Sequence, residues 1–448
     1  MSSITVGPKR RVPGIPLKWV QVPSSRRSLF DPVDGINLVE VGIALPRRDV
    51  ADRKEGAAVT KALAALPAPH ERIWKVLDHL KNGTTEEFDQ VVAVQPSEFT
   101  DPAIAARERE LVFGRVPSIV CHGSEIARPG DFLTLQMPRN KIIVVRQSDG
   151  SVKSFVNHCR HRGALLEERE RGSCRLFSCG YHRWSYNPDG SLRTVTRGNT
   201  FGDVDRAQHG LIELPTQERH GLVWMVDEAT ASIDVAAWLG AAVDEMLAGY
   251  RIDRLVTFRA AGYDEPVNWK IMQDAFIDNY HIQYAHPNSA GKHVYTNVQT
   301  VEDYGRHARM TTPRKSIDRV LDDHPSVDLL AKHVIDGHFL LPNSTLLRQT
   351  THFELLTFRP HPTETARCRM EMRMLVPTVE DAGMDSARWQ RLWEKNWSIL
   401  QAVLYDEDFP LLRGSQAAME SANAGPMLLG RNELVNHIFR RELHKLTS

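Results

Sequence analysis

The sequence predicts an α+β protein in which a small antiparallel β domain precedes a larger mixed domain. A chain of 448 residues is too long for one ordinary hydrophobic core, so two or more domains are expected. Strand–turn–strand patterns fill residues 117–232, and helical and extended patterns occur together in residues 233–448. We therefore expect an N-terminal extension at 1–95, a helix at 96–116 that packs on the last domain, then the β domain and the mixed domain.

Composition excludes several classes of protein. The 56 basic and 56 acidic side chains balance, which gives no reason to expect nucleic acid or an acidic membrane as a partner. No apolar run reaches the roughly 18 residues of a membrane span, and the basic start Met1–Arg11 is not followed by an apolar signal core. We expect a cytoplasmic protein, whose five cysteines are thiols or metal ligands rather than a disulfide scaffold.

The N-terminal extension contains no catalytic motif. Amphipathic helical patterns occur at Ala57–Leu66 and Glu71–Leu80, and Asn82-Gly83 ends the second. An oligomer contact or a cover over another domain is the favoured role. A further helix starts at Asp101-Pro102, where an N-cap acid precedes proline at the first helical position.

Short strands and tight turns define the β domain. Lys141–Gln147 is β-branched and apolar, Asp149-Gly150 supplies a hairpin turn, and Ser151–Asn157 returns as the next strand. Asn187–Gly190 is another turn signal, and Leu222–Val226 is typical of a further short strand. Loops are expected to project from this small sheet.

The mixed domain combines helices with strands. Trp269–Tyr284 is predicted as a helix, and Ser386–Tyr405 as a second helix with tryptophans and leucines on one side. Thr351–Phe358 and Arg367–Val376 are extended in character. In the second of these, one cysteine and three methionines alternate with charged residues, which predicts a strand with one apolar and one polar face.

Two motifs in the β domain each combine one cysteine with one histidine. Cys159-Arg160-His161 is followed, after 17 residues, by Cys179-Gly180-Tyr181-His182. Two thiolates on one iron and two imidazoles on the other are the ligands of a Rieske-type [2Fe–2S] cluster. Because neutral histidine replaces negative thiolate, charge opposes the addition of an electron less than in an all-cysteine cluster.

A zinc site is the alternative, since two cysteines and two histidines suffice for tetrahedral zinc. Zinc modules usually pair like with like, as Cys-x-x-Cys and His-x₃-His, so the mixed pairs favour the iron–sulfur cluster. Gly163, Gly172 and Gly180 suit tight loops whose N–H groups approach sulfide. We interpret the nearby Cys174 and His158 as bystanders.

A second candidate metal site contains Asp278, His281 and His286. Two histidines five apart point roughly 140° apart on a straight helix, so they converge only if the helix ends between them. Pro287 supplies the reason, because the residue before proline is pushed out of the α region. Two histidines and one carboxylate on one face are the ligands of a non-haem Fe(II) oxygenase, which leaves positions open for O₂ and substrate.

The carboxylate ligand must come from a distant segment. Asp406-Glu407-Asp408-Phe409-Pro410 ends the tryptophan-bearing helix. Helical geometry puts Glu407 near the centre of the apolar face and Asp408 at its edge, so geometry alone favours Glu407. Asp406 fits a solvated helix end.

The residues around both sites resemble the Rieske non-haem iron ring-hydroxylating oxygenases, large (alpha) subunit. The similarity rests on Cys159-Arg-His-Arg-Gly163, on residues 179–190 and on Asp-x-x-His-x₄-His ending at His286, and it covers about residues 99–448. The family usually has proline in place of Gly180 and glycine in place of Arg183, neither of which is a ligand. The resemblance implies a Rieske β domain and a helix-grip catalytic domain, in which a curved antiparallel sheet wraps around a long helix.

The resemblance also implies roles for the site residues. The ligands of the [2Fe–2S] cluster would be Cys159, His161, Cys179 and His182. The mononuclear Fe(II) would be held by His281, His286 and Asp408, the last in place of Glu407 because the helix is expected to distort before Pro410. Asp278 would bridge His182 of one subunit to His281 of the next in a head-to-tail homotrimer, with or without a small β subunit. A carboxylate suits this place because it accepts N–H from both imidazoles.

The implied function is an oxygenase that activates O₂ to mono- or cis-dihydroxylate an aromatic or similar small organic substrate. No Gly-x-Gly-x-x-Gly follows a strand, so electrons are expected from a separate reductase, with or without a ferredoxin. One alternative is an oxidative N-/O-demethylase or amine hydroxylase of the same family, which an aromatic cage with an acid would favour. The other is a Rieske electron-transfer protein whose second domain only binds a ligand.

Overall fold

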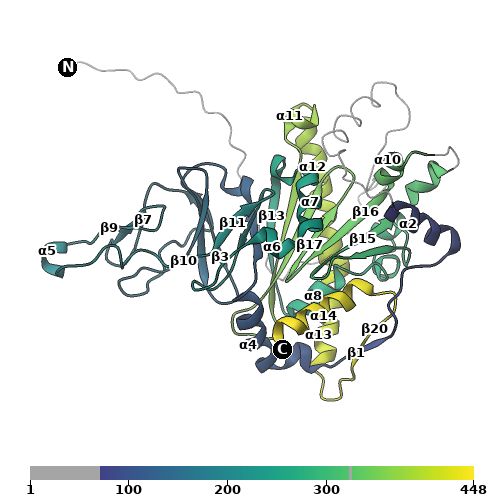
Figure 1. The fold of residues 1–448 in the computed structure, drawn as a ribbon, viewed down its shortest axis with the longest axis horizontal. Helices are drawn as coiled ribbons and strands as arrows, with labels where there is room; N and C mark the ends of the chain where they lie inside the picture. Colours follow the sequence, from purple (N-terminus) through teal and green to yellow (C-terminus); the bar gives the residue numbers. More distant parts are fainter. Residues whose placement is uncertain (1–70, 322–324) are drawn as a thin grey trace, which may run out of the picture.

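The computed structural model describes residues 71–321 and 325–448. The helix expected at Ala57–Leu66 lies outside these residues, as does most of the N-terminal extension. Figure 1 shows a small β domain on the left and a larger domain of sheet and helices on the right. The α+β class is therefore confirmed. Across the described ranges, every helix is too short or too polar to cross a membrane.

The small domain contains three antiparallel sheets. Their strands are, in spatial order, β10 (Glu213–Leu214), β5 (Val152–Val156), β4 (Lys141–Arg146), β3 (Asp131–Gln136) and β6 (Arg171–Ser173); β11 (Thr216–Arg219), β12 (Leu222–Met225) and β2 (Ser118–His122); and β7 (Phe177–Ser178), β8 (Ser185–Tyr186) and β9 (Leu192–Thr194). The expected hairpin at Asp149-Gly150 joins β4 to β5, and Gly150 has the positive φ of +88° that such a turn requires.

The large domain is built on one seven-stranded antiparallel sheet. Its spatial order is β13 (Val256–Glu265), β19 (Cys368–Val376), β18 (Phe353–Pro360), β17 (Ser344–Arg348), β16 (Val334–Leu340), β15 (His307–Pro313) and β14 (Thr300–Asp303). A two-stranded sheet pairs β1 (Val92–Val94) with β20 (Met427–Leu429).

Helices surround these sheets. The α-helices are α2 (Glu71–Asn82), α3 (Ser97–Thr100), α4 (Pro102–Glu108), α5 (Gly198–Phe201), α6 (Val235–Leu239), α7 (Ala241–Tyr250), α8 (Trp269–Ala275), α9 (Ile282–Ala285), α10 (Val327–Leu330), α11 (Val379–Ala382), α12 (Ser386–Ala402), α13 (Phe409–Met419) and α14 (Leu434–Thr447). Two π-helices, η1 (Arg109–Phe113) and η8 (Val403–Asp408), continue α4 and α12. The expected cap of α4 is present, because the Asp101 side chain accepts from Ala103 N.

One face of the large sheet packs against α8, α12 and α14. On α12, Trp389, Trp393 and Trp397 recur every fourth residue, and all three are buried against this face. The apolar side of β19, with its cysteine and methionines, lies in the same core. The three tryptophans of α12 form a stripe that packs on the sheet. This core holds the C-terminal end of α12 in place.

The charged side of β19 is also buried, against the small domain. Arg373 donates from Nε to Glu125 Oε1 at 2.7 Å and from Nη2 to the carbonyl of Val120 at 3.0 Å. Arg359, on β18, donates to the carbonyl of Ile119 at 2.9 Å. The face that the sequence predicts as polar therefore joins the two domains, because each buried arginine finds an acceptor across the boundary.

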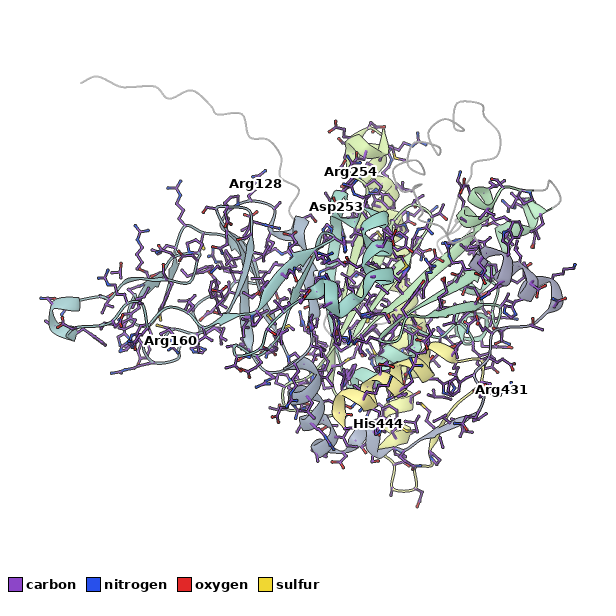
Figure 2. The ribbon with its side chains drawn as sticks, viewed as in Figure 1. Arg128, Arg160, Asp253, Arg254, Arg431 and His444 are labelled. Atoms are coloured by element: carbon purple, nitrogen blue, oxygen red, sulfur yellow. The ribbon has the colours of Figure 1, made fainter. Side chains whose placement is uncertain are left out.

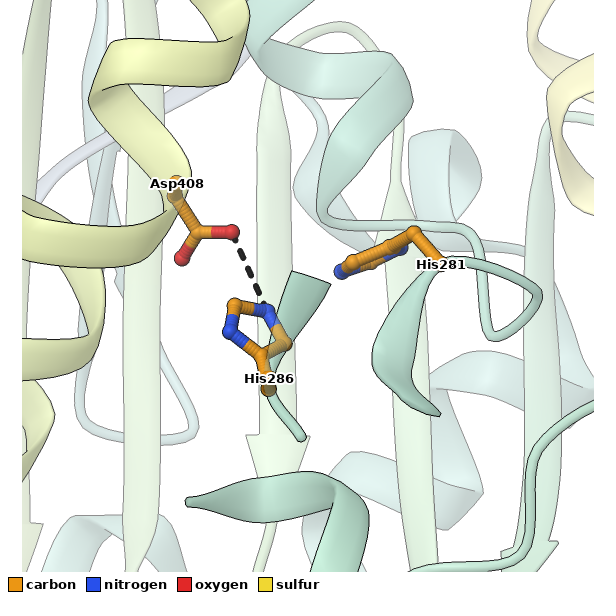
Figure 3. Close-up of side chains that lie close together, drawn as sticks. All are labelled: His281, His286 and Asp408. Atoms are coloured by element: carbon orange, nitrogen blue, oxygen red, sulfur yellow. Dashed lines mark ion pairs between the residues drawn. The ribbon is translucent and has the colours of Figure 1, made fainter. Parts of the chain in front are cut away.

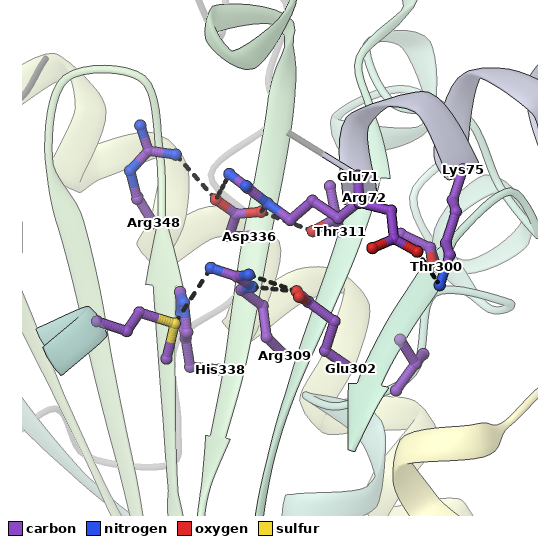
Figure 4. A network of polar contacts seen from close by, with 12 residues as sticks. Glu71, Arg72, Lys75, Thr300, Glu302, Arg309, Thr311, Asp336, His338 and Arg348 are labelled. Carbon is purple, nitrogen blue, oxygen red and sulfur yellow. Dashed lines mark hydrogen bonds and ion pairs between the residues drawn. The ribbon is translucent and has the colours of Figure 1, made fainter. Parts of the chain in front are cut away.

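A buried carboxylate ties α2 to the large sheet (Figure 4). Asp336 accepts from Arg72 at 3.3 Å, from Arg348 at 2.9 Å and from the Thr311 hydroxyl at 2.7 Å. Burial alone would raise the pKa of Asp336, but the arginines hold it well below its ordinary value. Residues 71–82 are thus part of the large domain's structure.

The helix predicted at Trp269–Tyr284 is wrong in its extent, since α8 ends at Ala275. Asp278 accepts from the backbone N–H groups of Tyr280 at 2.5 Å and His281 at 3.3 Å, and Asn279 donates to Thr312 Oγ1 at 2.8 Å. These side-chain bonds replace helical backbone bonds and turn the chain before a separate short helix, α9.

Candidate metal centres

The four proposed cluster ligands lie on two loops of the small domain. Cys159 and Cys179 are buried, whereas His161 and His182 are partly exposed, with their ring centroids 4.7 Å apart. His161 stacks on Trp184 at 4.9 Å, which fixes its ring plane. Two buried cysteines together with two neighbouring, partly exposed histidines fit the two-iron cluster described above.

Polar groups surround the sulfur atoms. The Tyr186 hydroxyl lies 3.3 Å from Cys159 Sγ, and Tyr181 N donates to Cys179 Sγ at 3.4 Å. Hydrogen bonds to sulfur favour the electron-rich state of a cluster and so adjust its potential. Burial raises the pKa of the Cys159 thiol in the metal-free protein, against the hydrogen bond from Tyr186.

Each of the two loops makes the same kind of backbone turn, which closes four residues after its cysteine. Gly163 N donates to Cys159 O at 2.9 Å with φ of +71°, and Arg183 N donates to Cys179 O at 3.0 Å with φ of +60°. Arg183 therefore occupies a left-handed position that favours glycine, which is the residue the resembling family has there.

Changing Arg183 to glycine is expected to stabilise this loop by about 1 kcal/mol, because the Cβ penalty of the left-handed region is removed. The measurement is the temperature at which the cluster's visible absorbance is lost. Arg162→Gly is the matched control. Arg162 lies in the other cysteine–histidine loop, and its backbone φ is not positive. An equal or lower temperature for Arg183→Gly would contradict the argument.

The second candidate centre brings together His281, His286 and Asp408 (Figure 3). One ligand atom of each residue lies within 4.8 Å of the others. His281 precedes α9 and His286 follows it, so the helix does end before the second histidine, as expected from Pro287. The His286 Nε2 to Asp408 Oδ1 distance is 3.2 Å. Two histidines and one carboxylate with this convergence fit an Fe(II) ion.

The π-helix η8 decides which acid joins the two histidines. A π-helix inserts a residue relative to the α-helical register, and Pro410 lacks the N–H that would bond back to Asp406. As a result Asp408 is buried beside the histidines, Glu407 is displaced to the outer side of His286, and Asp406 is exposed. Helical geometry without this distortion favoured Glu407.

Each histidine of the second centre also contacts a carboxylate through its Nδ1. Asp278 Oδ2 lies 2.8 Å from Nδ1 of His281, and Glu407 Oε2 lies 2.7 Å from Nδ1 of His286. Burial would lower the pKa of His286, but Asp408 and Glu407 outweigh it and raise this pKa above its ordinary value. Sequence reasoning missed the contact of Glu407 with His286, because its only sequence signal was the adjacent pair of acids.

The two centres are far apart within one chain. Figure 1 places β7, β9 and α5, which adjoin the cluster loops, at the far left, whereas α8 and α13 lie at the lower centre. Arg160, next to the proposed cluster ligand Cys159, is labelled near that left end in Figure 2. The structure brings Asp278 to His281 but does not bring His182 to Asp278 in the same chain.

Two family descriptions match the chain. Residues 117–204 match the Rieske [2Fe-2S] domain, and residues 252–448 match the ring hydroxylating alpha subunit (catalytic domain). Together these ranges cover more than half of the chain.

The chain is similar to proteins that are named dioxygenases and to others that are named monooxygenases. It is 27% identical to the anthranilate 1,2-dioxygenase large subunit of Acinetobacter baylyi, over 71% of this chain and 64% of that protein. It is 33% identical to the glycine betaine monooxygenase oxygenase subunit of Chromohalobacter salexigens, over 42% of each. The chain thus spans less than two thirds of the length of the relatives it matches.

Solved structures show the same fold. A quaternary ammonium Rieske monooxygenase in complex with L-carnitine has a TM-score of 0.66 at 17% identity, covering 85% of this chain and 98% of that one. Naphthalene 1,2-dioxygenase with indole bound has a TM-score of 0.61 at 18% identity, covering 80% and 92%.

Proposed function

We propose that this chain, which belongs to the Rieske ring-hydroxylating oxygenases of the large (alpha) subunit type, activates O₂ to hydroxylate an aromatic or similar small organic molecule. The family's cofactors are a Rieske [2Fe–2S] cluster and a mononuclear iron, so zinc is set aside for the first centre. The observation that carries the proposal is the convergence of His281, His286 and Asp408 in a chain that also has the paired cysteine–histidine loops.

We propose four ligands for the cluster and three for the mononuclear iron. The cluster would be held by Cys159, His161, Cys179 and His182, and the iron by His281, His286 and Asp408. When bound, the two groups supply single electrons and a site for the reduction of O₂. The protein's part is to orient His281 and His286. A carboxylate contacts Nδ1 of each ring, Asp278 for His281 and Glu407 for His286.

We propose that electrons cross a subunit boundary in a head-to-tail homotrimer. The distance between the centres within one chain supports this arrangement. Exposed aromatic side chains also support it: Tyr181 and Phe201 are 61% and 46% exposed beside the cluster loops, and Tyr280 and Tyr284 are 48% and 68% exposed beside His281. Such apolar groups favour contact with another protein surface. The native mass would distinguish a homotrimer from an assembly that includes a β subunit.

The electrons would come from a separate reductase, with or without a ferredoxin, since the sequence carries no nicotinamide or flavin fingerprint. A cytoplasmic location agrees with this proposal, because all five cysteines lack disulfide partners.

The proposed substrate is apolar. On the inner face of the sheet, Gly337 pairs with Met310 on one side and Leu347 on the other. A Cβ at Gly337 would meet Leu347 Cδ2 at 3.4 Å and Met310 Cε at 3.6 Å, and Leu347 is partly exposed although its strand is internal. Glycine inside a strand often marks a close approach by a ligand, and the apolar side chains beside Gly337 would suit a hydrocarbon ring. Substrates tested with a reductase should include quaternary amines, which the demethylase or amine hydroxylase alternative predicts.

The first experiment is a count of iron and acid-labile sulfide per chain after anaerobic purification. We expect about three irons and two sulfides. His286→Ala is expected to retain the sulfide and lose about one iron, because it removes one of the three ligands of the second centre.

Two irons and two sulfides in the unaltered protein, with no gain on addition of Fe(II), would favour the electron-transfer alternative. Zinc without sulfide would contradict the assignment of the first centre.

A further inference from the structure

His286 lies between two consecutive acidic residues. Its Nε2 faces Asp408 Oδ1 at 3.2 Å, and its Nδ1 faces Glu407 Oε2 at 2.7 Å. The side chain is only 5% exposed, so water cannot easily replace either contact. Because an ionised carboxylate can only accept hydrogen bonds, Nδ1 is the donor in the contact with Glu407, and Nε2 is the ring nitrogen that faces Asp408.

Glu407 is itself held in place. Ser289 Oγ donates to the same Glu407 oxygen at 2.6 Å. Ser289 belongs to the turn after His286, where Ser289 N donates to His286 O at 3.2 Å. Glu407 therefore connects the π-helix that carries one proposed iron ligand to the turn that carries another.

The π-helix explains how adjacent residues reach both nitrogens of one ring. Consecutive residues on an α-helix point about 100° apart. In η8 that divergence places Asp408 at the inner nitrogen of the His286 imidazole, Nε2, and Glu407 at its outer nitrogen, Nδ1. Ordinary α-helical register would have turned Glu407 toward the histidines and left the outer nitrogen of His286 without this acceptor.

We propose that Glu407 is a positioning residue for the mononuclear iron. It selects the His286 tautomer that presents Nε2 to the metal, orients the ring and increases the basicity of Nε2. Ser289 supports this role by fixing the carboxylate. The inference rests on the proposed function, since it requires that His281, His286 and Asp408 bind iron.

The test is the equilibrium affinity for Fe(II), measured anaerobically by competition with a chelator, in Glu407→Ala, Glu407→Gln and the unaltered protein. We expect Glu407→Ala to bind Fe(II) roughly 10- to 100-fold more weakly. Glu407→Gln keeps the volume and an acceptor oxygen but loses the charge, so we expect a smaller loss of roughly fivefold. Ser289→Ala should shift the affinity in the same direction by less than Glu407→Ala.

Asp406→Ala is the matched control, because Asp406 is an exposed acid one residue away. Sulfide content and the cluster's visible spectrum report the fold of each variant, and Co(II) substitution gives a ligand-field spectrum that should change in Glu407→Ala. Fe(II) affinities within twofold of the unaltered protein in both Glu407 variants would overturn the inference. If the unaltered protein binds no third iron, the proposed function fails instead.

Discussion

Replacing Asp278 with alanine is expected to lower turnover by roughly 100-fold while both metals stay bound in the presence of excess Fe(II). Asp278 Oδ2 lies 2.8 Å from Nδ1 of His281, and its side chain is 12% exposed, so it can also reach a group outside the chain. In the proposed assembly that group is the partner subunit's His182. Removal of the carboxylate breaks this connection and leaves Nδ1 of His281 without its acceptor.

The measurement separates electron transfer from metal loss. The cluster is reduced without oxygen and mixed with O₂ and substrate, and its reoxidation is followed by absorbance. With excess Fe(II) present, iron and sulfide per chain should match the unaltered protein. Asp406→Ala should reoxidise normally, because Asp406 is exposed and lies outside the proposed ligand set. Reoxidation of Asp278→Ala at the unaltered rate would contradict the bridge.

Acidification from pH 7.5 to pH 5 is expected to cost roughly 4 kcal/mol of stability through two buried histidines, about 2 kcal/mol from each. His307 accepts from Leu341 N at 3.1 Å and donates to Trp238 O. His338 donates to Leu346 O at 2.9 Å and lies 2.9 Å from the Tyr250 hydroxyl. Each ring is neutral in these contacts, and a second proton would remove the nitrogen that accepts.

Burial sets the direction of both shifts. It lowers the pKa of His307 to about 4, with Arg306 in the same direction and Glu442 opposed. It lowers the pKa of His338 to about 4, with Arg309 and Arg348 in the same direction and Asp336 opposed (Figure 4). The unfolded chain, with histidine pKa values near 6.5, then binds more protons between pH 6.5 and pH 4, so stability falls as pH falls through this window.

Thermal or denaturant midpoints at pH 7.5 and pH 5 test this. His338→Asn keeps a donor for Leu346 O and removes one titrating group, so its midpoint should depend less on pH. His444→Gln is the control, because His444 lies exposed on α14 (Figure 2). The account is wrong if His338→Asn shows the full pH dependence of the unaltered protein.

Features that depend only on residues close together in the sequence could be predicted from the sequence. The hairpin at Asp149-Gly150 and the helix start at Asp101-Pro102 follow from turn and cap chemistry that acts over a few residues. The paired cysteine–histidine motifs likewise identified the Rieske domain that residues 117–204 match. The helix predicted to reach Tyr284 was wrong because Asp278 and Asn279 bond to the backbone and to Thr312 instead of continuing it.

By itself, the sequence determined the α+β class and the family, since these depend on residue identity and short spacing. The resemblance implied Asp408 as the third ligand, but only the tertiary structure placed Asp408 beside His281 and His286 and Glu407 against Nδ1 of His286. It also decided that the charged side of β19 is buried and that burial lowers the pKa of His338. These outcomes depend on contacts between distant segments and on a π-helical shift of register, which no local pattern of residue types encodes.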